Sequence, residues 1–500
     1  MFSRCVNLVV LLLSILSSSL FAQWSDIIQI TSEKFDHEMP VFASYLPIYG
    51  PSSTVDYLVF TRKDSVGSNI CVKKTVEYGK KWDDNVTYIT SDSFVNTSPS
   101  IARRLVYPTD DKIMIVWQSN RNGNNNIYYS LGNGVTWSTP NPITTEPMDD
   151  INPSVGVYGT TFIVSWESNG LIKSSLFLNN RWSDAINVSD SNFNSSPKIS
   201  SSSWEPSVVF WDKKLGDSVQ ILYSIFKNNI WSVPKLFKTI DDKSNLSITK
   251  IFDNFGNIQV TWDQRGETDI EVYGRSSDFN FDTLRWSVES NLSQAPLTHN
   301  KNASSIFIPI IWKEAKHNFY FDVLAFEDSS NSNDQIRAKC LFMYEDEIFN
   351  TNGLDKNPAV SCGVLDEQTW PQPFNVWVVW QTNESGRWQL AGSYLTITAW
   401  GVEDDNTPEI FKLNQNYPNP FNYGTSIPYS IDKPINVNLE IFNLLGIRVK
   451  VFSEMYASAG EYQFYWDGKN ESGIPLPSGV YYYRLSSGIY FRNRSMILLK

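Results

Sequence analysis

Seven short apolar stretches, each ending in a large aromatic residue and a polar residue, decide the fold. They are DYLVFT (residues 56–61), KIMIVWQ (112–118), TFIVSWE (161–167), PSVVFWD (206–212), NIQVTWD (257–263), FDVLAFE (321–327) and NVWVVWQ (375–381). Successive aromatics are 57, 49, 45, 51, 64 and 54 residues apart. A polar turn and a second apolar stretch follow each copy, and in five units a Trp then opens a further segment. Four short strands in a unit of about 50 residues are typical of a β-propeller blade.

Seven units predict an all-β, seven-bladed propeller over residues 23–400, because a single blade cannot bury both of its faces. The recurring aromatics should pack between blades, so we expect Trp117, Trp166, Trp211, Trp262 and Trp380 to be almost fully buried. The segment QWSDIIQIT (23–31) is similar to the fourth-strand segments WSDAINVS and WSTPNPIT, and we expect it to complete the last blade. Alternatively, Ser393 and Trp400 have the spacing that would let this blade supply its own fourth strand.

Composition and the N-terminus indicate an exported protein. The chain has 500 residues, 41% of them hydrophobic, and a net charge of −12, which argues against a general nucleic-acid binder and against docking on anionic lipid by charge. Residues 1–22 read as a secretory signal peptide, with Arg4, an apolar run and small residues up to Ala22. No later apolar stretch reaches the length of about 18 residues that a membrane span needs, so the mature chain should have no transmembrane segment.

Cysteine and histidine are too few to suggest a metal or disulfide framework. Outside the signal peptide the cysteines are Cys71, Cys340 and Cys362, of which the last two could pair if their strands are neighbours. The histidines are His37, His299 and His317, and no two have a ligand spacing, so each is interpreted as an ordinary exposed side chain. We expect no metal and no cofactor.

The C-terminal 88 residues differ from the rest. VNLEIF, IRVKVF, EYQFYW and VYYYRL alternate apolar and polar residues and are separated by turn signals, which predicts a small antiparallel β-sandwich over residues 413–500. Residues 401–412 should form a polar linker.

This segment closely resembles the immunoglobulin-like C-terminal sorting domain of proteins exported by the type IX secretion system. The matching residues are Asn416, Pro418, Asn419, Pro420, Phe421, Asn443, Gly446, Val449, Ala459, Gly460, Trp466, Asp467, Gly468, Gly473, Ser478, Gly479, Val480, Tyr481 and Met496, and the terminal run ends at Lys500. The resemblance implies that residues 413–500 bind the type IX machinery and that the protein passes through the periplasm to the outer cell surface or the medium.

The propeller has a fainter family resemblance. A hydroxyl residue precedes a Trp by seven positions in four pairs, Thr75–Trp82, Ser130–Trp137, Ser175–Trp182 and Ser224–Trp231. SLGNGVTW (130–137) resembles the Asp-box of sialidase-type propellers, with Gly132 where that motif has Asp, and residues 119–129 resemble repeats of the periplasmic Tol-system propeller. Asp-boxes are turn and packing devices, so this resemblance concerns the fold.

The candidate binding residues follow the wedge aromatics. Glu167, Asp212, Asp263 and Glu327 each come directly after one, and Arg62, Arg121 and Arg265 lie in the same set of loops. If these strand ends face the mouth of a central channel, the acids could bind a cation, an amine or sugar hydroxyls, and the arginines an anion. The alternative, which we favour, is that each acid accepts hydrogen bonds from backbone amides of its own turn.

These observations predict a secreted or cell-surface binding protein with a glycan or protein ligand. The alternative is an extracellular glycoside hydrolase or lyase on the same propeller, because acids are plentiful and a glycosidase needs only two convergent carboxylates. Sialidases take their first substrate-binding arginine from a Phe/Tyr-Arg-Ile-Pro motif that this sequence lacks, so no catalytic residue is assigned.

Overall fold

The computed structural model describes residues 24–499 except 33, 44–54, 77–78, 105–111, 191–192, 201–206, 241–245, 251–257, 266–269, 281–282, 288, 294–299, 311–318, 330–333, 341–344, 365–373, 398–410, 432–434, 444–447, 458–459, 472 and 488–489. The described residues form strands and turns only, and none of them belongs to a helix that could cross a membrane. The chain divides into two compact units: Trp24–Cys340 with Tyr344–Ile397 form one, and Thr398–Lys500 belong to the other.

The larger unit contains seven antiparallel sheets in its described residues. The first has β2 (Asp36–Ala43), β3 (Tyr57–Lys63), β4 (Ser68–Val76), β5 (Lys81–Trp82) and β6 (Thr87–Tyr88), and the second has β7 (Asn96–Arg104), β8 (Lys112–Ser119), β9 (Asn126–Gly132) and β10 (Asn141–Pro142). The third has β11 (Asp150–Tyr158), β12 (Thr161–Ser168), β13 (Leu171–Leu178), β14 (Arg181–Trp182) and β15 (Ile186–Asn187), and the fourth has β16 (Asn194–Ser200), β17 (Ser207–Leu215), β18 (Ser218–Lys227), β19 (Ile230–Trp231) and β20 (Lys235–Ile240).

The remaining three sheets follow the same plan. The fifth has β21 (Leu246–Lys250), β22 (Ile258–Arg265), β23 (Ile270–Asn280), β24 (Thr283–Trp286) and β25 (Ser290–Asn291). The sixth has β26 (Asn300–Ile310), β27 (Phe319–Asp328), β28 (Gln335–Cys340) and β29 (Glu345–Phe349), and the seventh has β30 (Asp355–Val364), β31 (Phe374–Thr382), β32 (Gln389–Ile397) and β1 (Ile28–Gln29).

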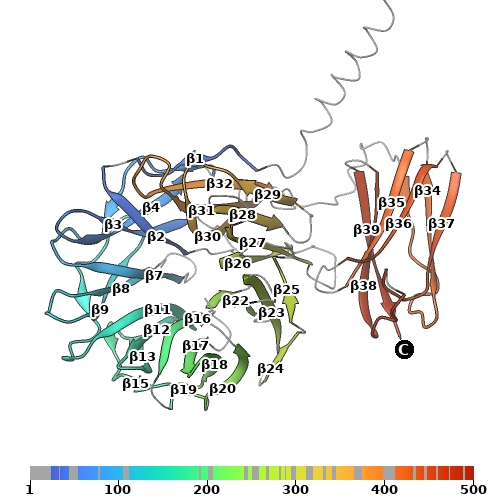
Figure 1. Ribbon diagram of the computed structural model, residues 1–500. Helices are drawn as coiled ribbons and strands as arrows, with labels where there is room; N and C mark the ends of the chain where they lie inside the picture. Colours follow the sequence, from blue (N-terminus) through green and yellow to red (C-terminus); the bar gives the residue numbers. More distant parts are fainter. Residues whose placement is uncertain are drawn as a thin grey trace, which may run out of the picture. The chain divides into compact units, whose positions relative to one another are not determined.

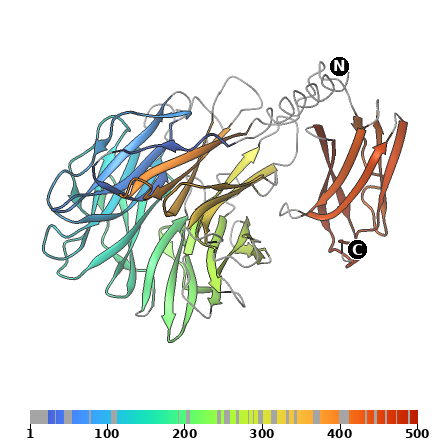
Figure 2. The ribbon, with the colours of Figure 1, turned by 45° about the horizontal axis from the view of Figure 1, so that its top comes forward.

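The sheets surround a common axis. The first strands β2, β7, β11, β16, β21, β26 and β30, called the inner strands below, contact one another in that order, and β30 contacts β2. Figure 1 shows the sheets radiating outward from these strands, and Figure 2 shows neighbouring sheets lying face to face. This is a β-propeller, as the sequence predicted.

The recurring aromatics fill the space between sheets. Trp117, Trp166, Trp211, Trp262 and Trp380 are at most 1% exposed, which confirms the predicted burial. Two of the indole N–H groups find partners at the start of the inner strands: Trp117 Nε1 donates to Asn96 Oδ1 (3.1 Å) and Trp211 Nε1 to Asn194 Oδ1 (2.9 Å). A buried indole needs such an acceptor, which explains a fully buried Asn at these positions.

The N-terminal segment completes the seventh sheet. β1 pairs with β32, placing Ile28 opposite Gly392 and Gln29 opposite Ala391, and Trp24 forms a bridge to Leu395. The predicted closure by residues 23–31 is therefore confirmed for the described residues, and Trp400 of the alternative lies outside them. Joining the two ends of the unit in one sheet leaves no open edge at the seam.

The outer hairpins are fixed by paired serines. Ser130, Ser175 and Ser224 each donate a hydrogen bond to the carbonyl of the Ser that follows the next Trp, at 2.6 to 2.8 Å. Gly132 fits this turn because a Cβ there would lie 2.4 Å from Cε3 of Trp137. The Trp137 ring occupies the space that an Asp would need, so the departure from the Asp-box has a steric reason.

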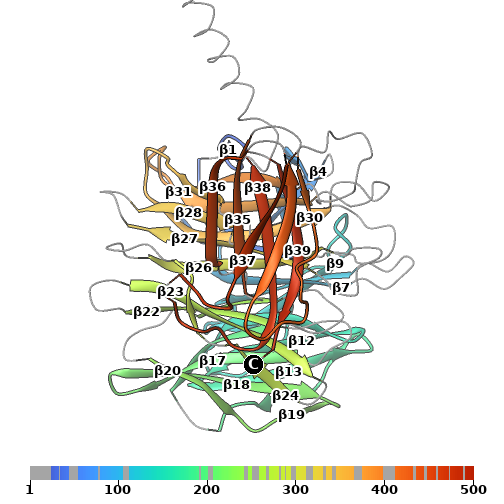
Figure 3. The same ribbon diagram turned by 90° about the vertical axis from the view of Figure 1, so that its right-hand side faces the viewer.

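The smaller unit is a two-layer β-sandwich. One sheet has the order β33 (Phe411–Leu413), β34 (Thr425–Ile431) and β37 (Gly460–Trp466), and the other has β36 (Arg448–Ala457), β35 (Ile435–Phe442), β38 (Gly479–Ser487) and β39 (Tyr490–Leu498). Figure 3 shows the strands of the two sheets, and both sheets contribute to one core that includes Tyr429, Trp466, Leu439 and Tyr483. Phe411 and Lys412 lie in β33, so the sandwich begins before the predicted boundary at 413.

The structure describes the side chains of His37, Cys71 and Cys340. His37 is fully buried at the start of β2 with Nδ1 3.3 Å from Gln389 Oε1, so the expectation of an exposed side chain is wrong for this residue. Its position is the one that Asn96 and Asn194 occupy in their sheets, and its ring lies edge-on to Phe60, with the ring centres 5.3 Å apart. Cys71 and Cys340 are buried. The side chains of Cys362, His299 and His317 lie outside the described residues.

Candidate ligand-binding end of the propeller

A β-bulge interrupts the inner strand of six sheets close to its start. The bulge residues Met39, Ser98, Asn152, Ser196, Asn302 and Asn357 are left-handed, with φ between 52° and 55°. Pairing with the next strand slips at the same point in every case. Five of the six precede Pro, whose ring cannot continue the ladder of hydrogen bonds. Each bulge therefore turns a backbone N–H away from its own sheet.

The residue directly after the wedge aromatic accepts that N–H from the following sheet. The acceptors are Gln118 for Asn152 N (2.9 Å), Glu167 for Ser196 N (3.4 Å), Asp263 for Asn302 N (2.9 Å), Glu327 for Asn357 N (2.8 Å) and Gln381 for Met39 N (3.1 Å). We call this series of bonds between sheets the belt. Among the described residues it links five of the seven neighbouring pairs, including the seventh sheet with the first.

Three of the bulge asparagines also donate a side-chain hydrogen bond to the belt acceptor of their own sheet. Asn152 Nδ2 donates to Glu167 Oε2 (3.2 Å), Asn302 Nδ2 to Glu327 Oε1 (2.6 Å) and Asn357 Nδ2 to Gln381 Oε1 (2.5 Å). Glu327 also lies 3.6 Å from Lys301 Nζ. Glu327 and Asp263 are almost fully buried, at 2% and 3% exposure. A buried carboxylate is stabilised by such donors, so these acids act as fixed acceptors that hold sheets together.

The predicted acids are thus brought to one end of the ring, but their partners differ from those expected. Among the described residues, Glu167, Asp263 and Glu327 do accept backbone amides, and these amides belong to the next sheet. Asp212 stands at the equivalent position of the fourth sheet, opposite Ser195, and is half-buried. Their role as ligand-binding residues stays a prediction.

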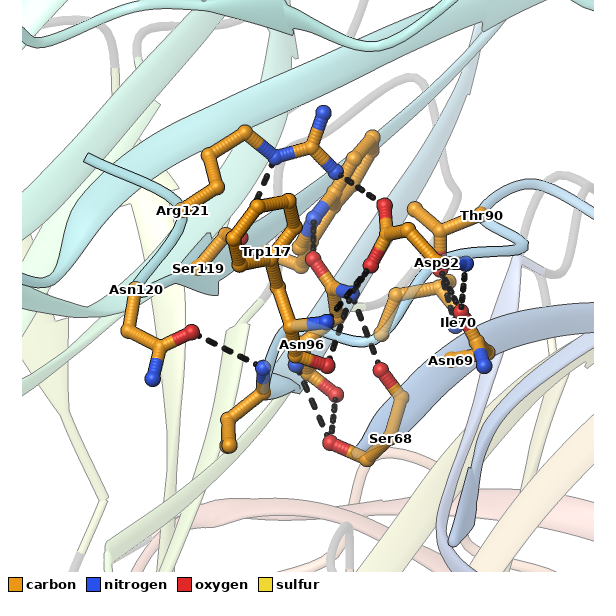
Figure 4. Close-up of polar contacts among 12 residues, drawn as sticks. Ser68, Asn69, Ile70, Thr90, Asp92, Asn96, Trp117, Ser119, Asn120 and Arg121 are labelled. Carbon is orange, nitrogen blue, oxygen red and sulfur yellow. Dashed lines mark hydrogen bonds and ion pairs between the residues drawn. The ribbon is translucent and has the colours of Figure 1, made fainter. Parts of the chain in front are cut away.

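The predicted arginines contact acids and aromatic rings. Figure 4 shows Arg121, whose Nη2 lies 2.7 Å from Asp92 Oδ2 and whose guanidinium carbon lies 4.6 Å from the ring centre of Tyr128. Asp92 Oδ1 in turn accepts Asn96 Nδ2 (2.9 Å), which connects Arg121 to the wedge Trp117. The cluster anchors the loop before β7.

Arg62, the second of the predicted arginines, lies against two aromatic rings. The guanidinium carbon of Arg62 lies 3.6 Å from the ring centre of Phe35 and 5.3 Å from that of Tyr88. A cation held over aromatic faces in this way is stabilised by their quadrupoles. Arg265 ends β22, and its side chain lies outside the described residues.

Apolar side chains are exposed on the loops at this end of the ring. Phe94, Met148 and Leu354 lie just before inner strands and are 38% to 42% exposed, and Phe193 is 73% exposed with φ of 73°. A left-handed conformation is unfavourable for a bulky residue, so the surrounding loop must hold it. The end that carries the belt therefore combines exposed apolar groups with hydrogen-bonded acids. Among the described residues no group of His, Cys, Asp and Glu is arranged to hold a metal ion.

The bulges and the belt do not follow from the pattern of apolar residues, although a repeated motif marks them in the sequence. NTSP (96–99), DINP (150–153), NSSP (194–197) and DKNP (355–358) repeat a polar residue, a spacer, a left-handed Asn or Ser and a Pro. In the structure they lie inside the inner strands.

The candidate sorting residues mostly support the sandwich itself. Asn416, Phe421, Trp466, Tyr481 and Met496 are at most 3% exposed and Gly468 is buried, whereas Pro418, Asn419, Pro420, Gly460 and Asp467 are exposed and Gly479 is half-buried. Asn419 Oδ1 accepts Ile497 N (2.8 Å), and Phe421 exchanges backbone hydrogen bonds with Ile497 and Leu499. The NPF segment thereby fastens the last strand. Gly446 and Lys500 lie outside the described residues.

Comparisons with known proteins identify the smaller unit. Residues 424–488 match the FlgD Ig-like domain family. This unit is an immunoglobulin-like domain. No curated protein matches the chain.

Solved structures of propellers resemble the chain at low identity. A Trypanosoma rangeli sialidase has 8% identity and a TM-score of 0.37, covering 95% of this chain and 89% of its own. The catalytic domain of a Coprinopsis cinerea GH62 α-L-arabinofuranosidase has 11% identity and a TM-score of 0.34, covering 76% and 99%. A GH93 α-L-arabinofuranosidase of Fusarium graminearum has 10% identity and a TM-score of 0.35, covering 60% and 92%. These likenesses concern the fold alone.

Proposed function

We propose that this is a secreted or cell-surface binding protein whose propeller takes an extracellular glycan or protein at the end of the ring that carries the belt. The observation that supports binding is the use made of the carboxylates there. Glu167, Asp263 and Glu327 each accept a hydrogen bond from the next sheet. A general acid or nucleophile must instead be available to the substrate. The exposed Phe94, Met148, Phe193 and Leu354 provide apolar contact area around that end.

The proposal also covers export. Residues 413–500 would direct the protein through the type IX secretion system, after a signal peptide at 1–22 has delivered it to the periplasm. Support comes from the resemblance of the motif residues and from the separate core of the immunoglobulin-like domain, which shares no residue with the propeller clusters. A domain with its own core can serve as a folded address.

A microarray of extracellular glycans and a turnover assay test the binding part on one preparation of the full chain. We expect saturable binding to a defined glycan set, or to an isolated surface protein, and no turnover of fluorogenic sialosides. Measurable sialidase activity that a single carboxylate substitution abolishes would contradict the proposal and favour the glycoside hydrolase.

A further inference from the structure

The immunoglobulin-like domain carries three strongly exposed tyrosines. Tyr417 is 80% exposed, Tyr423 87% and Tyr465 61%. Among the described aromatic residues of the propeller, only Phe193, at 73%, is exposed to a similar degree. An aromatic ring gains free energy when it leaves water, and large apolar groups that gather on a surface are typical of a binding site. These tyrosines therefore matter if they lie together.

Two of the rings flank one residue of the smaller sheet. Ser426 in β34 pairs with Tyr417 on one side and with Tyr465 of β37 on the other, and Figure 1 labels both strands. Directly paired residues point to the same face of a sheet. Ser426 alternates with the buried Thr425 and Ile427, so this face is the outer one. The spacing of neighbouring strands puts the backbones of Tyr417 and Tyr465 about 10 Å apart.

Gly424 brings the third ring into contact with this pair. A Cβ at Gly424 would lie 2.1 Å from the hydroxyl oxygen of Tyr465 and 2.5 Å from its Cζ, so a larger residue does not fit there. The Tyr465 ring thus lies along the sheet, against the backbone of the residue that follows Tyr423. We call Tyr417, Tyr423 and Tyr465 the tyrosine patch.

The sequence around the tyrosine patch is uncharged. Residues 413–431 contain no Asp, Glu, Lys or Arg, and neither do residues 462–466. Asp467 and Lys469, which follow β37, form an ion pair with each other at 2.9 Å. Interfaces between proteins are usually enriched in arginine as well as in tyrosine, and these two stretches hold no arginine. The patch is therefore complementary to a ligand without charge.

Amide and hydroxyl groups accompany the rings. Gln463 lies two residues before Tyr465 on the same face of β37 and is exposed, as is Asn422, while Ser426 is half-buried. Such groups both donate and accept hydrogen bonds, as sugar hydroxyls require. The C–H face of a pyranose ring is apolar and can stack on an aromatic ring. Two rings about 10 Å apart are spaced by roughly the length of a disaccharide.

We propose that the tyrosine patch is a second binding surface of the protein and takes a linear, neutral glycan that lies across β34 and β37. Its sugar rings stack on Tyr417 and Tyr465, and Gln463 and Asn422 bind hydroxyl groups. The inference goes beyond the proposed function, which places the ligand of the propeller on the other unit and assigns the immunoglobulin-like domain to export only.

Calorimetric titration of the purified full-length protein with cellohexaose, xylohexaose and laminarihexaose tests the proposal. We expect saturable binding of at least one of these neutral chains. Its affinity should stay the same when the salt concentration is raised, because no charged group contributes to the contact.

Variants of the patch separate stacking from other effects. Tyr417→Ser combined with Tyr465→Ser should weaken binding by about tenfold or more, whereas Tyr417→Phe combined with Tyr465→Phe keeps both rings and should retain most of the affinity. All four changes are at exposed side chains, so both double variants should fold. Ile474→Ser, at a 59% exposed residue of the same domain, is the matched control and should bind like the natural protein. Equal affinity of the serine double variant and the natural protein would overturn the proposal.

The remaining outcomes are also decisive. If no hexasaccharide binds and the folded serine double variant is no longer exported, the patch contacts a protein and the glycan proposal is wrong. If no hexasaccharide binds and export is normal, the proposal is wrong as well. On the glycan microarray, neutral glycans that the serine double variant loses belong to the patch, and glycans that it still binds belong to the propeller, so the two binding functions stand or fall separately.

Discussion

Ser25 and Ser393 lie 368 residues apart in the sequence, and their hydroxyl oxygens are 3.2 Å from each other. Ser393 Oγ donates to the carbonyl of Ser25 (2.7 Å), and Tyr394 N donates to Ser25 Oγ (3.1 Å). The same two bonds occur within one continuous stretch of the third sheet, where Ser175 Oγ donates to the carbonyl of Ser183 (2.7 Å) and Leu176 N donates to Ser183 Oγ (3.1 Å). Ser25 is thus the counterpart of Ser183, supplied from the other end of the propeller.

This equivalence predicts what the loss of either hydroxyl will do. Ser25→Ala and Ser183→Ala each remove the hydroxyl that accepts a backbone N–H, from Tyr394 and Leu176 respectively, and leave the bond to the carbonyl in place. Each should lower the free energy of unfolding by about 1–2 kcal/mol. Only Ser25→Ala should also loosen the seam, seen as faster amide exchange in β32. Chemical denaturation and hydrogen exchange measure the two effects. Equal exchange in β32 for both variants would show that Ser25 does not hold the seam.

The wedge tryptophans should contribute through both packing and a hydrogen bond. Trp211 is fully buried and donates to Asn194, so Trp211→Ala should cost about 3–5 kcal/mol, and Trp211→Phe about 1–3 kcal/mol. Ile230→Ala, at a 70% exposed residue of the same sheet, should change stability by less than about 0.5 kcal/mol. Denaturation curves test the series, and a Trp211→Ala cost as small as that of Ile230→Ala would refute the packing described here.

The belt predicts that an amide can replace a carboxylate in it. Gln381 accepts Met39 N and Asn357 Nδ2 in the seventh sheet, and Glu327 accepts Asn357 N and Asn302 Nδ2 in the sixth. Glu327→Gln should therefore be nearly neutral, whereas Glu327→Ala leaves buried donors unsatisfied and should cost about 1–3 kcal/mol. Thermal unfolding distinguishes them. Equal destabilisation by both substitutions would mean that the negative charge itself is required.

A buried carboxyl group in the seventh sheet should make stability depend on pH. Burial raises the pKa of Asp355 from 3.8 to about 6, while hydrogen bonds from Thr351, Thr382 and Trp380 act to lower it. The folded state then binds the proton more tightly than the unfolded chain, so this contribution is fully present below the unfolded pKa and is lost as pH rises through about 6.

Asn stands at the equivalent position in the second and fourth sheets, so Asp355→Asn should fold. The free energy of unfolding of the variant minus that of the natural protein should be greater at pH 7.5 than at pH 4, by on the order of 1–3 kcal/mol. Denaturation at a series of pH values gives this difference. A difference that stays constant with pH would contradict the assigned titration.

The sequence revealed the wedge aromatics and the closing strand because both follow from the pattern of apolar residues. Trp117 is predicted by the apolar run before it, and Trp24-Ser25 by its likeness to Trp182-Ser183. The belt could not be read in this way, because it depends on the left-handed backbone at Asn152, Ser196 and Asn302 and on partners that are 29 to 39 residues away. Hydropathy does not report backbone conformation, and each acid takes its amide from another sheet.

The candidate site, too, could be predicted from the sequence only in part. The acids after the wedge aromatics were found because they repeat, but repetition alone does not separate a ligand contact from a structural one.

Fractionation of the host culture after changes in residues 413–500 tests the account's central claim, export of a folded propeller by its C-terminal domain. Removing residues 494–500 would also delete Met496 and Leu498, both fully buried, so that truncation alone cannot separate sorting from folding. The decisive comparison is therefore between the full chain and a chain that ends after residue 410, with circular dichroism showing that the propeller remains folded. We predict that the full chain reaches the cell surface or the medium and that the shortened chain accumulates, folded, in the periplasm. Normal export of the shortened chain would contradict the account and leave residues 413–500 as an immunoglobulin-like domain without a sorting role.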